Sequence, residues 1–417
     1  MRTLYTLLLA LLTPLIVLRL WLKGRVQPAY RQRIGERFGR VPAHPVAVWV
    51  HAVSVGESVA ALPLIEALIK RHGERQVWVT TTTPTGSERV AASLGARVIH
   101  TYAPYDLPQI VARFLDRARP RQVVVMETEL WPNLFAALKA RGIPLTIANA
   151  RLSPRSFKGY SRVAGFARAV LGNVTTVAAQ SRLDGERFTA LGAPHVQVIG
   201  NLKFDLALPA GAHPLTAQIS AYWPAPRPVW AAVSTHEGEE DVVLAAHRQL
   251  LRHEPKSLLI LVPRHPQRFE DVARRLTALG LPFCRRSTLG EATPEGSASI
   301  LLGDSMGEVM AYLAAAQTAF VGGSLVPVGG HNVLEPAALG LPVLFGPHMH
   351  NFLDARALLL GAEVAREVTD ADGLCAALLD WLPPGDAQRV RSELARAAVA
   401  ANRGALQKLL ALLAQNP

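Results

Sequence analysis

The sequence is poor in cysteine and has neither a fixed-period repeat nor a low-complexity segment. Its 2 cysteines, Cys284 and Cys375, lie far apart and form no CxxC pair. This spacing excludes a disulfide scaffold and a thiolate metal site, and it favours a reducing compartment. The chain also lacks helix-turn-helix, zinc-finger and RNA-motif signatures, and no basic helix is interleaved with aromatic residues. We therefore do not expect nucleic acid as a partner.

Candidate metal ligands are sparse as well. Asp370-Ala371-Asp372 is a DxD string of the kind found in metal-dependent transferases, but we expect it to cap a helix that starts near Asp372. His348 and His350 have no cysteine partners and no HxxxH helix beside them. We expect these two histidines to line a ligand pocket or to be solvated rather than to bind zinc.

The length and the apolar pattern predict a two-domain α/β protein. A chain of 417 residues is too long for one ordinary core. Apolar runs alternate with helical patterns, which is typical of a doubly wound parallel sheet. The expected strands are 46–50, 77–80, 97–100, 122–126, 145–148 and 176–179 in the first half, and 229–233, 258–262, 300–302, 319–321 and 343–345 in the second.

A proline-rich segment separates the two halves. Residues 206–228 contain five of the chain's prolines and predict an interdomain linker. We expect residues 23–205 to form one Rossmann-like domain and residues 229–417 to form another. Two such domains should face each other across a cleft, with ligands bound at the carboxyl ends of the strands.

The N-terminal segment, residues 1–22, has the composition of a membrane helix. From residue 3 to residue 22 it is apolar apart from threonines, a tyrosine, Pro14 and Arg19, and it has about the ~20 residues that span a bilayer. No small-x-small cleavage site follows it, and residues 23–40 hold six Lys/Arg against one acid. We expect an uncleaved single-pass anchor with the body of the protein in the cytoplasm. A cleaved signal peptide and a helix lying in the interface are the alternatives.

The net charge of +12 is compatible with nucleic acid, an anionic membrane or an acidic substrate as partner. Part of this charge is concentrated in residues 150–183, which contain no acid. The basic residues of this stretch are Arg151, Arg155, Lys158, Arg162, Arg168 and Arg182. They predict either a solvated helix face or a dock for the phosphates of a lipid-borne substrate.

The segment 329–336, GGHNVLEP, is the most informative motif. It follows an apolar run and precedes a short helical segment that Gly340 closes. A strand, a glycine loop and a helix N-terminus form a natural anion site. Because proline is tolerated only in the first turn of a helix, Pro336 predicts a helix that begins near His331 or Asn332. Glu335 could then accept two ribose hydroxyls. The alternative is a capped αβ junction with an incidental acid.

Two further motifs in the first half carry acids at strand ends. HAVSVGES, residues 51–58, places Glu57 near a helix start, where it either stabilises the helix dipole or serves as a general base. ETELWPN, residues 127–133, places two acids directly after a buried-looking run. One of them could cap the following helix, which leaves the other for a ligand.

Similar positions recur in the second half. Ser234 and Thr235 follow a strand and could cap a helix while binding phosphate. Arg264 at another strand end is placed to clamp a phosphate. The loop 303–308 supplies one more helix mouth, and Lys203, just before the linker, could reach the cleft.

These blocks together resemble one family, the glycosyltransferases that add 3-deoxy-D-manno-oct-2-ulosonic acid (Kdo) to the lipid A precursor. The family carries HAxSVGE, ETELWPN, NARLS, GNLKFD, STHEGEE, PRH, GHNxLEP and GPHxxNF in this order. The matching residues here are 51–57, 127–133, 149–153, 200–205, 234–240, 263–265, 330–336 and 346–352. Any single block is weak, whereas eight blocks in order are highly specific.

The resemblance implies a GT-B fold that binds the donor CMP-Kdo mainly in its C-terminal domain and the acceptor lipid, tetra-acylated lipid IVA, in its N-terminal domain. It implies an inverting transfer without metal or cofactor at the inner membrane of a Gram-negative bacterium. Glu57 matches the family's general base. The expected acceptor residues are Glu127, Arg151 and Arg155, and the expected donor residues are Lys203, Ser234, Thr235, Arg264, His265, Met306, Gly330, His331, Asn332 and Glu335.

Two other functions remain compatible with the sequence. One is a different GT-B enzyme that uses another nucleotide sugar, such as a UDP-sugar transferase or epimerase. The other is a non-catalytic, membrane-bound sensor of sugars or nucleotides. Protection by CMP but not UDP would exclude the first, and turnover would exclude the second.

Overall fold

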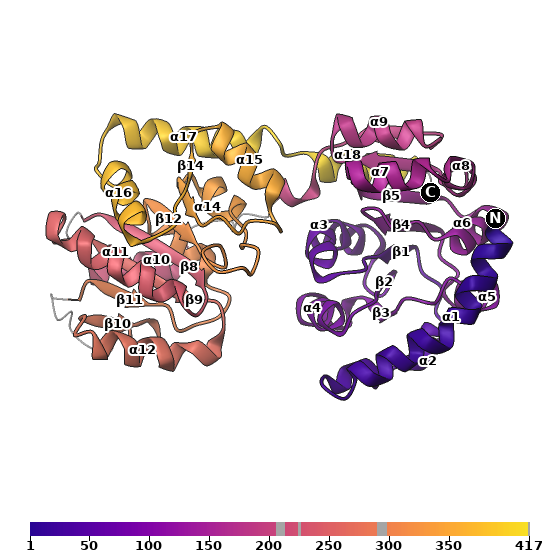
Figure 1. Cartoon of the computed structure of the whole chain (residues 1–417), viewed down its shortest axis with the longest axis horizontal. Helices are drawn as coiled ribbons and strands as arrows, with labels where there is room; N and C mark the ends of the chain where they lie inside the picture. Colours follow the sequence, from indigo (N-terminus) through magenta and orange to yellow (C-terminus); the bar gives the residue numbers. More distant parts are fainter. Residues whose placement is uncertain (206–212, 224–226, 290–297, 416–417) are drawn as a thin grey trace. The chain divides into compact units, whose positions relative to one another are not determined.

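The computed structural model describes residues 1–205, 213–223, 227–289 and 298–415, and it consists of two compact units (Figure 1). Unit 1 comprises Met1–Asp205 together with Asn402–Pro417, and unit 2 comprises Leu206–Ala401. Parts of the expected linker, residues 206–212 and 224–226, lie outside the described residues. The described part of that linker contains a helix, α10 (Pro214–Tyr222), which the proline content did not predict.

Unit 1 is built on a parallel sheet of seven strands in the order β3-β2-β1-β4-β5-β6-β7. The strands are β1 (Val48–His51), β2 (Val77–Thr81), β3 (Ile99–Tyr102), β4 (Gln122–Met126), β5 (Leu145–Ala150), β6 (Thr176–Ala179) and β7 (Val196–Val198). The strand order reverses between β1 and β4. In open α/β sheets such a reversal is where ligands bind, at the carboxyl ends of the strands.

Helices cover both faces of this sheet, which is why its central strands read as continuous apolar runs. One core joins Trp49 of β1 to Phe114 and Phe135, and the other joins the sheet to Leu64 and Leu409. The helices of unit 1 are α1 (Arg2–Lys23), α2 (Ile34–Arg37), α3 (Val55–His72), α4 (Pro84–Leu94), α5 (Pro108–Ala118), α6 (Pro132–Ala140), α7 (Pro154–Ser161), α8 (Ala164–Leu171), α9 (Arg182–Ala190) and α18 (Ala405–Ala414), with the short 3-10 helices η1 (Pro28–Arg31), η2 (Gly95–Arg97) and η3 (Leu202–Phe204).

Unit 2 repeats this architecture with the strand order β10-β11-β9-β8-β12-β13-β14. Its strands are β8 (Val229–Thr235), β9 (Leu258–Pro263), β10 (Phe283–Arg285), β11 (Ile300–Leu302), β12 (Thr318–Val321), β13 (Val343–Phe345) and β14 (Ala365–Glu367). Here the order reverses between β8 and β12. The motif 234–240 begins at the end of β8, and the glycine motif 329–336 comes after β12, so the second ligand edge is at this reversal.

The core of unit 2 packs Trp230 and Phe320 of the central strands against Leu250, Leu276 and Leu378 of the surrounding helices. In addition to α10, the helices are α11 (Glu239–His253), α12 (Phe269–Ala278), α13 (Val309–Ala314), α14 (Leu334–Leu339), α15 (Leu353–Gly361), α16 (Ala371–Trp381) and α17 (Asp386–Ala400), with η4 (Pro266–Arg268) and η5 (Arg286–Thr288). All eleven expected strands are present, with ends that differ by at most two residues. β7, β10 and β14 were missed because each is a three-residue strand with little buried surface.

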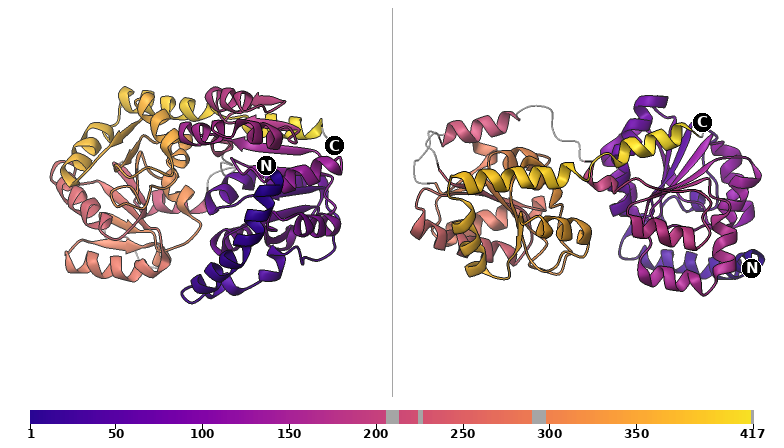
Figure 2. Two further views of the ribbon diagram at one scale, coloured as in Figure 1. Left: turned by 45° about the vertical axis from the view of Figure 1, so that its right-hand side comes forward. Right: turned by 90° about the horizontal axis from the view of Figure 1, so that it is seen from above.

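The last helix corrects the expected domain boundary, because the second domain does not extend to residue 417. α18 packs on α3 and η3 of unit 1, and its Leu409 and Leu413 are fully buried there (Figure 2). The carboxylate of Asp205 accepts hydrogen bonds from the backbone N–H groups of Gly404 and Leu406, both at 2.6 Å. Asp205 thereby caps α18, although the two are about two hundred residues apart in sequence. A contact over this distance cannot be predicted from the sequence pattern.

Candidate active site

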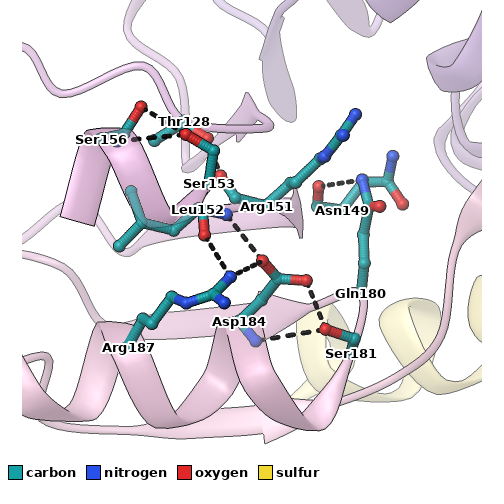
Figure 3. A network of polar contacts seen from close by, with 10 residues as sticks. All are labelled: Thr128, Asn149, Arg151, Leu152, Ser153, Ser156, Gln180, Ser181, Asp184 and Arg187. Carbon is teal, nitrogen blue, oxygen red and sulfur yellow. Dashed lines mark hydrogen bonds and ion pairs between the residues drawn. The ribbon is translucent and has the colours of Figure 1, made fainter. Parts of the chain in front are cut away.

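The ligand edge of unit 1 is marked by backbone that is strained at two adjacent strand ends. Glu127, directly after β4, has φ +56°, and Asn149 in β5 has φ +53°. Residues other than glycine rarely adopt such values, and the strain collects at functional sites. Asn149 is held by its neighbours, since its side-chain oxygen accepts from the Leu202 N–H at 3.0 Å and its backbone oxygen from the Gln180 amide at 2.8 Å (Figure 3).

Glu57 lies in the first turn of α3 and is buried, with 8% of its surface exposed. The Ser54 hydroxyl accepts from the Glu57 N–H at 3.2 Å and donates to the Glu57 carboxylate at 3.0 Å, while the Val53 N–H donates to the other carboxylate oxygen at 2.8 Å. This arrangement is close to a capping box. Glu57 therefore caps the helix, as one of the two sequence interpretations expected. Its carboxylate is also held in a fixed orientation at the ligand edge.

The environment of Glu57 raises the pKa of its carboxyl to about 7. Burial is the main cause, and the negative charges of Glu127 and Glu129 add to it, while the hydrogen bonds from Val53 and Ser54 oppose it. A general base is most effective when its pKa is near the working pH. Glu57 thus combines a helix-capping position with the acid–base properties of a catalytic carboxylate.

His51 and Trp131 lie beside the acidic cluster formed by Glu57, Glu127 and Glu129. His51 is fully buried, and burial lowers its pKa to about 4, so its ring is neutral at physiological pH. Its Nδ1 lies 2.8 Å from the Thr80 hydroxyl, and its ring stands edge-on to Trp131 with 4.8 Å between ring centres. The Trp131 indole N–H donates to the Glu129 carboxylate at 2.9 Å. His51 is therefore placed to orient the acidic loop through Trp131.

Two buried nitrogen atoms at this edge have no hydrogen-bond partner in the described part of the chain. They are Nε2 of His51 at the end of β1 and Nδ2 of Asn149 in β5. Because β4 lies between β1 and β5, the two nitrogens flank the strand that leads into Glu127. Buried polar atoms are almost always paired in native proteins, so the pair indicates a place for water or for ligand oxygens.

The expected acceptor cations lie beside this edge. Arg151 directly follows β5 and is exposed, and its backbone oxygen accepts a hydrogen bond from the Thr128 hydroxyl (Figure 3). The backbone of the next residue, Leu152, is held in place, because its N–H donates to the Asp184 carboxylate at 2.8 Å. Figure 3 shows the Arg151 side chain extending away from this network. Arg155 is exposed on α7. Both guanidinium groups are thus available to solvent near the loop that carries Glu127.

The ligand edge of unit 2 is organised by a carboxylate that the sequence analysis did not single out. Glu239 is completely buried, and it accepts four backbone hydrogen bonds, from His236 at 2.9 Å, Gly323 at 2.7 Å, Ser324 at 2.9 Å and Leu325 at 2.8 Å. The backbone N–H groups of the loop after β12 therefore bind the side-chain carboxylate of Glu239. The sequence feature that could have indicated Glu239 is the acidic pair at 239–240, which directly follows the loop at the end of a strand.

Three histidines gather above this carboxylate. Nε2 of His236 lies 2.8 Å from Nε2 of His331, and the two rings are stacked with an interplanar angle of 7°. His265 stands edge-on to His236 at 5.3 Å. Burial, followed by the charges of His236, Arg264 and His265, lowers the pKa of His331 to about 4. Burial likewise lowers the pKa of His236, and at this distance between the two Nε2 atoms one ring donates its N–H to the other.

The glycine loop and its helix correct one detail of the sequence prediction. α14 begins at Leu334 rather than near His331 or Asn332 and has 6 residues, with Pro336 still in its first turn. The reason is local, because the Asn332 side chain accepts from the Leu334 N–H at 3.0 Å and donates to the Glu335 carboxylate at 3.0 Å. At Gly330, with φ +79°, a Cβ would lie 2.3 Å from the sulfur of Met349, so only glycine fits.

The remaining donor candidates divide into two groups. Ser234 (φ +57°) has a strained conformation one residue before the end of β8, and the backbone N–H of Arg264 donates to the oxygen of Thr235, the last residue of that strand, at 3.0 Å. The Thr235 hydroxyl is buried and donates to Glu240 at 3.2 Å. Met306 is 56% exposed in the loop before α13, and Lys203 lies in η3 of unit 1.

The structure also resolves the question of the DxD string. The Asp370 carboxylate accepts from the Gly373 N–H at 2.8 Å at the start of α16, which confirms the capping prediction. Within the described residues, no three His, Cys, Asp or Glu side chains are placed to hold a metal ion.

Two parallel seven-stranded sheets with motifs at the carboxyl ends of the strands define the GT-B fold. A solved glycosyltransferase from Rickettsia africae has the same fold, with a TM-score of 0.54 at 16% identity, and the match covers 89% of this chain and 98% of that one. At this identity the likeness concerns the fold alone.

The sequence comparisons give the family. Residues 32–206 match the family model described as 3-deoxy-D-manno-octulosonic-acid transferase (kdotransferase). A 3-deoxy-D-manno-octulosonic acid transferase of Haemophilus influenzae is 41% identical over 420 residues, which covers 99% of this chain and 98% of that protein. A transferase of the same name from Bordetella pertussis is 40% identical over 428 residues, with 98% of each chain covered. The chain belongs to the Kdo transferase family.

Proposed function

We propose that this enzyme transfers Kdo from CMP-Kdo to the tetra-acylated lipid A precursor, lipid IVA, with inversion at the transferred carbon and without a divalent metal. The reaction would take place at the inner membrane of a Gram-negative bacterium, with both units in the cytoplasm. The observation that carries this proposal is the buried Glu57 carboxyl, whose pKa is raised to about 7 at the ligand edge of unit 1.

In this mechanism Glu57 takes the proton from the 6′-hydroxyl of the glucosamine disaccharide as that oxygen attacks C2 of Kdo. The new C2–O bond forms while the bond from C2 to the CMP phosphate breaks, and the electron pair leaves with CMP. The Val53 and Ser54 hydrogen bonds fix the direction of the carboxylate. Glu127 and Glu129 increase its basicity through their charge.

Glu127 and the two buried nitrogens of His51 and Asn149 are suited to sugar hydroxyls. A carboxylate accepts hydrogen bonds from hydroxyls, and an amide N–H donates to them. We assign to this group the orientation of the acceptor sugar or of the Kdo hydroxyls. Arg151 and Arg155 are exposed cations beside the same edge, and guanidinium groups bind phosphate in bidentate fashion. We assign to them the phosphates of the lipid acceptor.

The donor would bind at the ligand edge of unit 2. The leaving CMP phosphate requires cations and N–H donors, because negative charge develops on it in the transition state. Arg264 is half-buried beside the histidine cluster, and its guanidinium has no carboxylate partner among the described residues. We assign the phosphate to Arg264 and to the loop from Gly330 to Asn332, which includes His331. The loop around Ser234, with His265 and Met306, would surround the rest of the donor.

Glu335 is assigned to the ribose hydroxyls of CMP. Its carboxylate already accepts from the Asn332 amide at 3.0 Å, which fixes its direction beside the glycine loop. A carboxylate oxygen has more than one lone pair, so ribose hydroxyls can bind in addition to this amide.

The proposal is tested by a transfer assay with detergent-solubilised enzyme, CMP-Kdo generated in situ and lipid IVA, in the presence of EDTA, with products identified by mass. One or more Kdo units added to the lipid would support the donor, the acceptor and metal independence together. A parallel reaction with UDP-sugars serves as the control for donor class. Transfer from a UDP-sugar, or activity that is restored only by a divalent metal, would contradict the proposal.

A further inference from the structure

The N-terminal helix α1 contacts α6 and η1 of unit 1, and one of its faces is less exposed than the other (Figure 1). The buried and half-buried positions recur at helical spacing from the first turn to the residue after the last turn. They are Tyr5, Thr6, Leu9, Thr13, Ile16, Val17, Leu20 and Gly24. Thr13, at the middle of the helix, is only 8% exposed. A helix that projects from a protein into a membrane would have no such stripe over its full length.

The opposite face is exposed and consists of large apolar side chains. Leu11 and Leu7 are 74% and 63% exposed, and the others are Leu4, Leu8, Leu12, Leu15, Leu18, Trp21 and Leu22. A contiguous apolar surface of this size on a soluble unit marks an interaction site. Basic side chains lie at both ends of the helix, with Arg2 in its first turn and Arg19 and Lys23 near its end.

The N-terminal end of α1 is tied to the sequence motif at residues 127–133. The Thr6 hydroxyl donates to the Asn133 side chain at 3.0 Å, and the Tyr5 hydroxyl is hydrogen-bonded to Asp106. Asp106 is a buried carboxylate that caps α6 by accepting from the N–H groups of Asn133 at 3.0 Å and Leu134 at 2.7 Å. The first turn of α1 is therefore part of the polar network that holds α6.

The C-terminal end of α1 is tied to the same unit. The Arg31 guanidinium donates to the backbone oxygen of Trp21 at 3.0 Å and lies over its ring. A few residues further on, Arg33 donates to the His100 oxygen and Arg37 to the Thr82 oxygen, both at 2.8 Å. Polar contacts with unit 1 thus hold α1 at both ends.

We infer that α1 lies in the plane of one leaflet of an anionic bilayer, with its leucine face in the acyl chains, and does not cross the membrane. This inference rests on the membrane attachment in the proposed function, and it replaces the single-pass anchor that the composition predicted. A helix of 22 residues is about 33 Å long, so a crossing would carry Tyr5 and Thr6 to the far side of the bilayer. The contacts with Asp106 and Asn133 would then be impossible.

Charge complementarity selects an anionic leaflet as the partner. α1 has basic residues at both ends, and α7, which packs on α8, carries the exposed residues Arg155 and Lys158. The ring of Tyr5 on α1 lies 6.4 Å from that of Phe166 on α8, so the start of α1 lies close to the helix on which α7 packs. A leucine-rich helix with basic margins is typical of a segment that lies in the membrane interface.

This arrangement has a consequence for the acceptor. The first turn of α1 abuts α6, whose preceding residue is Trp131, the hydrogen-bond partner of Glu129. Glu129 in turn acts on Glu57 through its charge. With α1 embedded in the leaflet, the acidic cluster is held close to the headgroup layer. A sugar headgroup would reach Glu57 while its acyl chains stay in the membrane.

The two topologies place the N-terminus on opposite sides of the membrane. The test is a Thr3→Cys substitution in a full-length Cys284→Ser background, labelled with a membrane-impermeant maleimide in spheroplasts and in inverted vesicles. Thr3 is exposed, and the remaining cysteine, Cys375, is buried. We expect labelling only in inverted vesicles, as for the control Val26→Cys, which is 92% exposed and follows the helix. Labelling of Thr3→Cys in spheroplasts would overturn the inference.

If Thr3→Cys is labelled in neither preparation because lipid shields it, depth measurements distinguish the two topologies. An environment-sensitive fluorophore is placed at Leu4, Leu11 or Leu18 of the full-length protein in nanodiscs with anionic lipid, and quenching by lipids brominated at defined positions is compared. We expect the three sites to have the same shallow depth. A crossing helix would place Leu11 at the bilayer centre with the other two sites shallow, which would refute the inference. Neither readout depends on transferase activity. A wrong membrane topology can therefore be distinguished from a wrong proposed function.

Discussion

Replacement of Glu57 by glutamine should stabilise the protein at alkaline pH. The folded environment raises the pKa of this carboxyl from 4.5 to about 7, mainly through burial. The folded state therefore binds the proton more tightly than the unfolded state, and stability falls as the pH rises from 4.5 through 7. The shift is 7 − 4.5 = 2.5 units, and at about 1.36 kcal/mol per unit the ionised carboxylate costs at most about 3 kcal/mol.

Glutamine has the shape of the protonated acid, so it avoids this cost without creating a cavity. Its oxygen can accept from the Val53 N–H, and its amide can donate to the Ser54 hydroxyl. At pH 4.5 the wild type and Glu57→Gln should be equally stable. At pH 8.5 the variant should be more stable by about 2–3 kcal/mol, or roughly 5–10 °C in thermal midpoint. Urea unfolding in detergent at both pH values, followed by intrinsic fluorescence, measures the difference.

Glu66→Gln is the matched control. Glu66 lies on the same helix, but it is half-exposed and pairs with Arg97 at 2.6 Å, which lowers its pKa. Its substitution should have a small effect of the opposite sign. A Glu57→Gln protein that is less stable than wild type at pH 8.5 would refute the reasoning. It would mean that the capping hydrogen bonds of the carboxylate outweigh its burial cost.

Three further predictions concern unit 2 and the C-terminal helix. Glu239→Ala leaves four backbone N–H groups unpaired, so we expect a loss of about 3–5 kcal/mol in unfolding free energy, and an unchanged unfolding curve would contradict this role. Arg264→Ala should weaken CMP-Kdo binding at least tenfold in calorimetry, while the exposed Arg274→Ala has no effect; equal losses for donor and lipid would place Arg264 outside the donor site. Asp205→Ala should cost about 1–2 kcal/mol and open α18 to limited proteolysis, which a resistant helix would disprove.

The sequence predicted those features that depend on local pattern. The alternation of apolar runs gave eleven strands because central strands of a doubly wound sheet are buried on both faces. The motif positions followed from the rule that ligands bind at strand ends. Pro336 correctly indicated a helix start, but the side chain of Asn332 moved that start to Leu334.

The rest depends on contacts between residues far apart in sequence. The role of Glu239 is recognisable only in the folded loop after β12, and the whole of unit 2 lies in sequence between Asp205 and the helix α18 that it caps. The composition of α1 predicted a membrane helix, but the hydrogen bond of Thr6 with Asn133 could not be read from composition. The strained backbone of Glu127 and Asn149 likewise has no local signature.

The central claim, that Glu57 is the general base, is tested most directly by single-turnover transfer with saturating CMP-Kdo. Donor binding by wild type and Glu57→Gln is first measured by calorimetry, and the transfer rate is then followed by mass between pH 6 and pH 9. We predict unchanged donor affinity and a fall in transfer rate of about 10²–10⁴-fold. We also predict a wild-type rate that rises with pH through about 7, where the carboxyl ionises. A Glu57→Gln rate within tenfold of wild type would contradict the account.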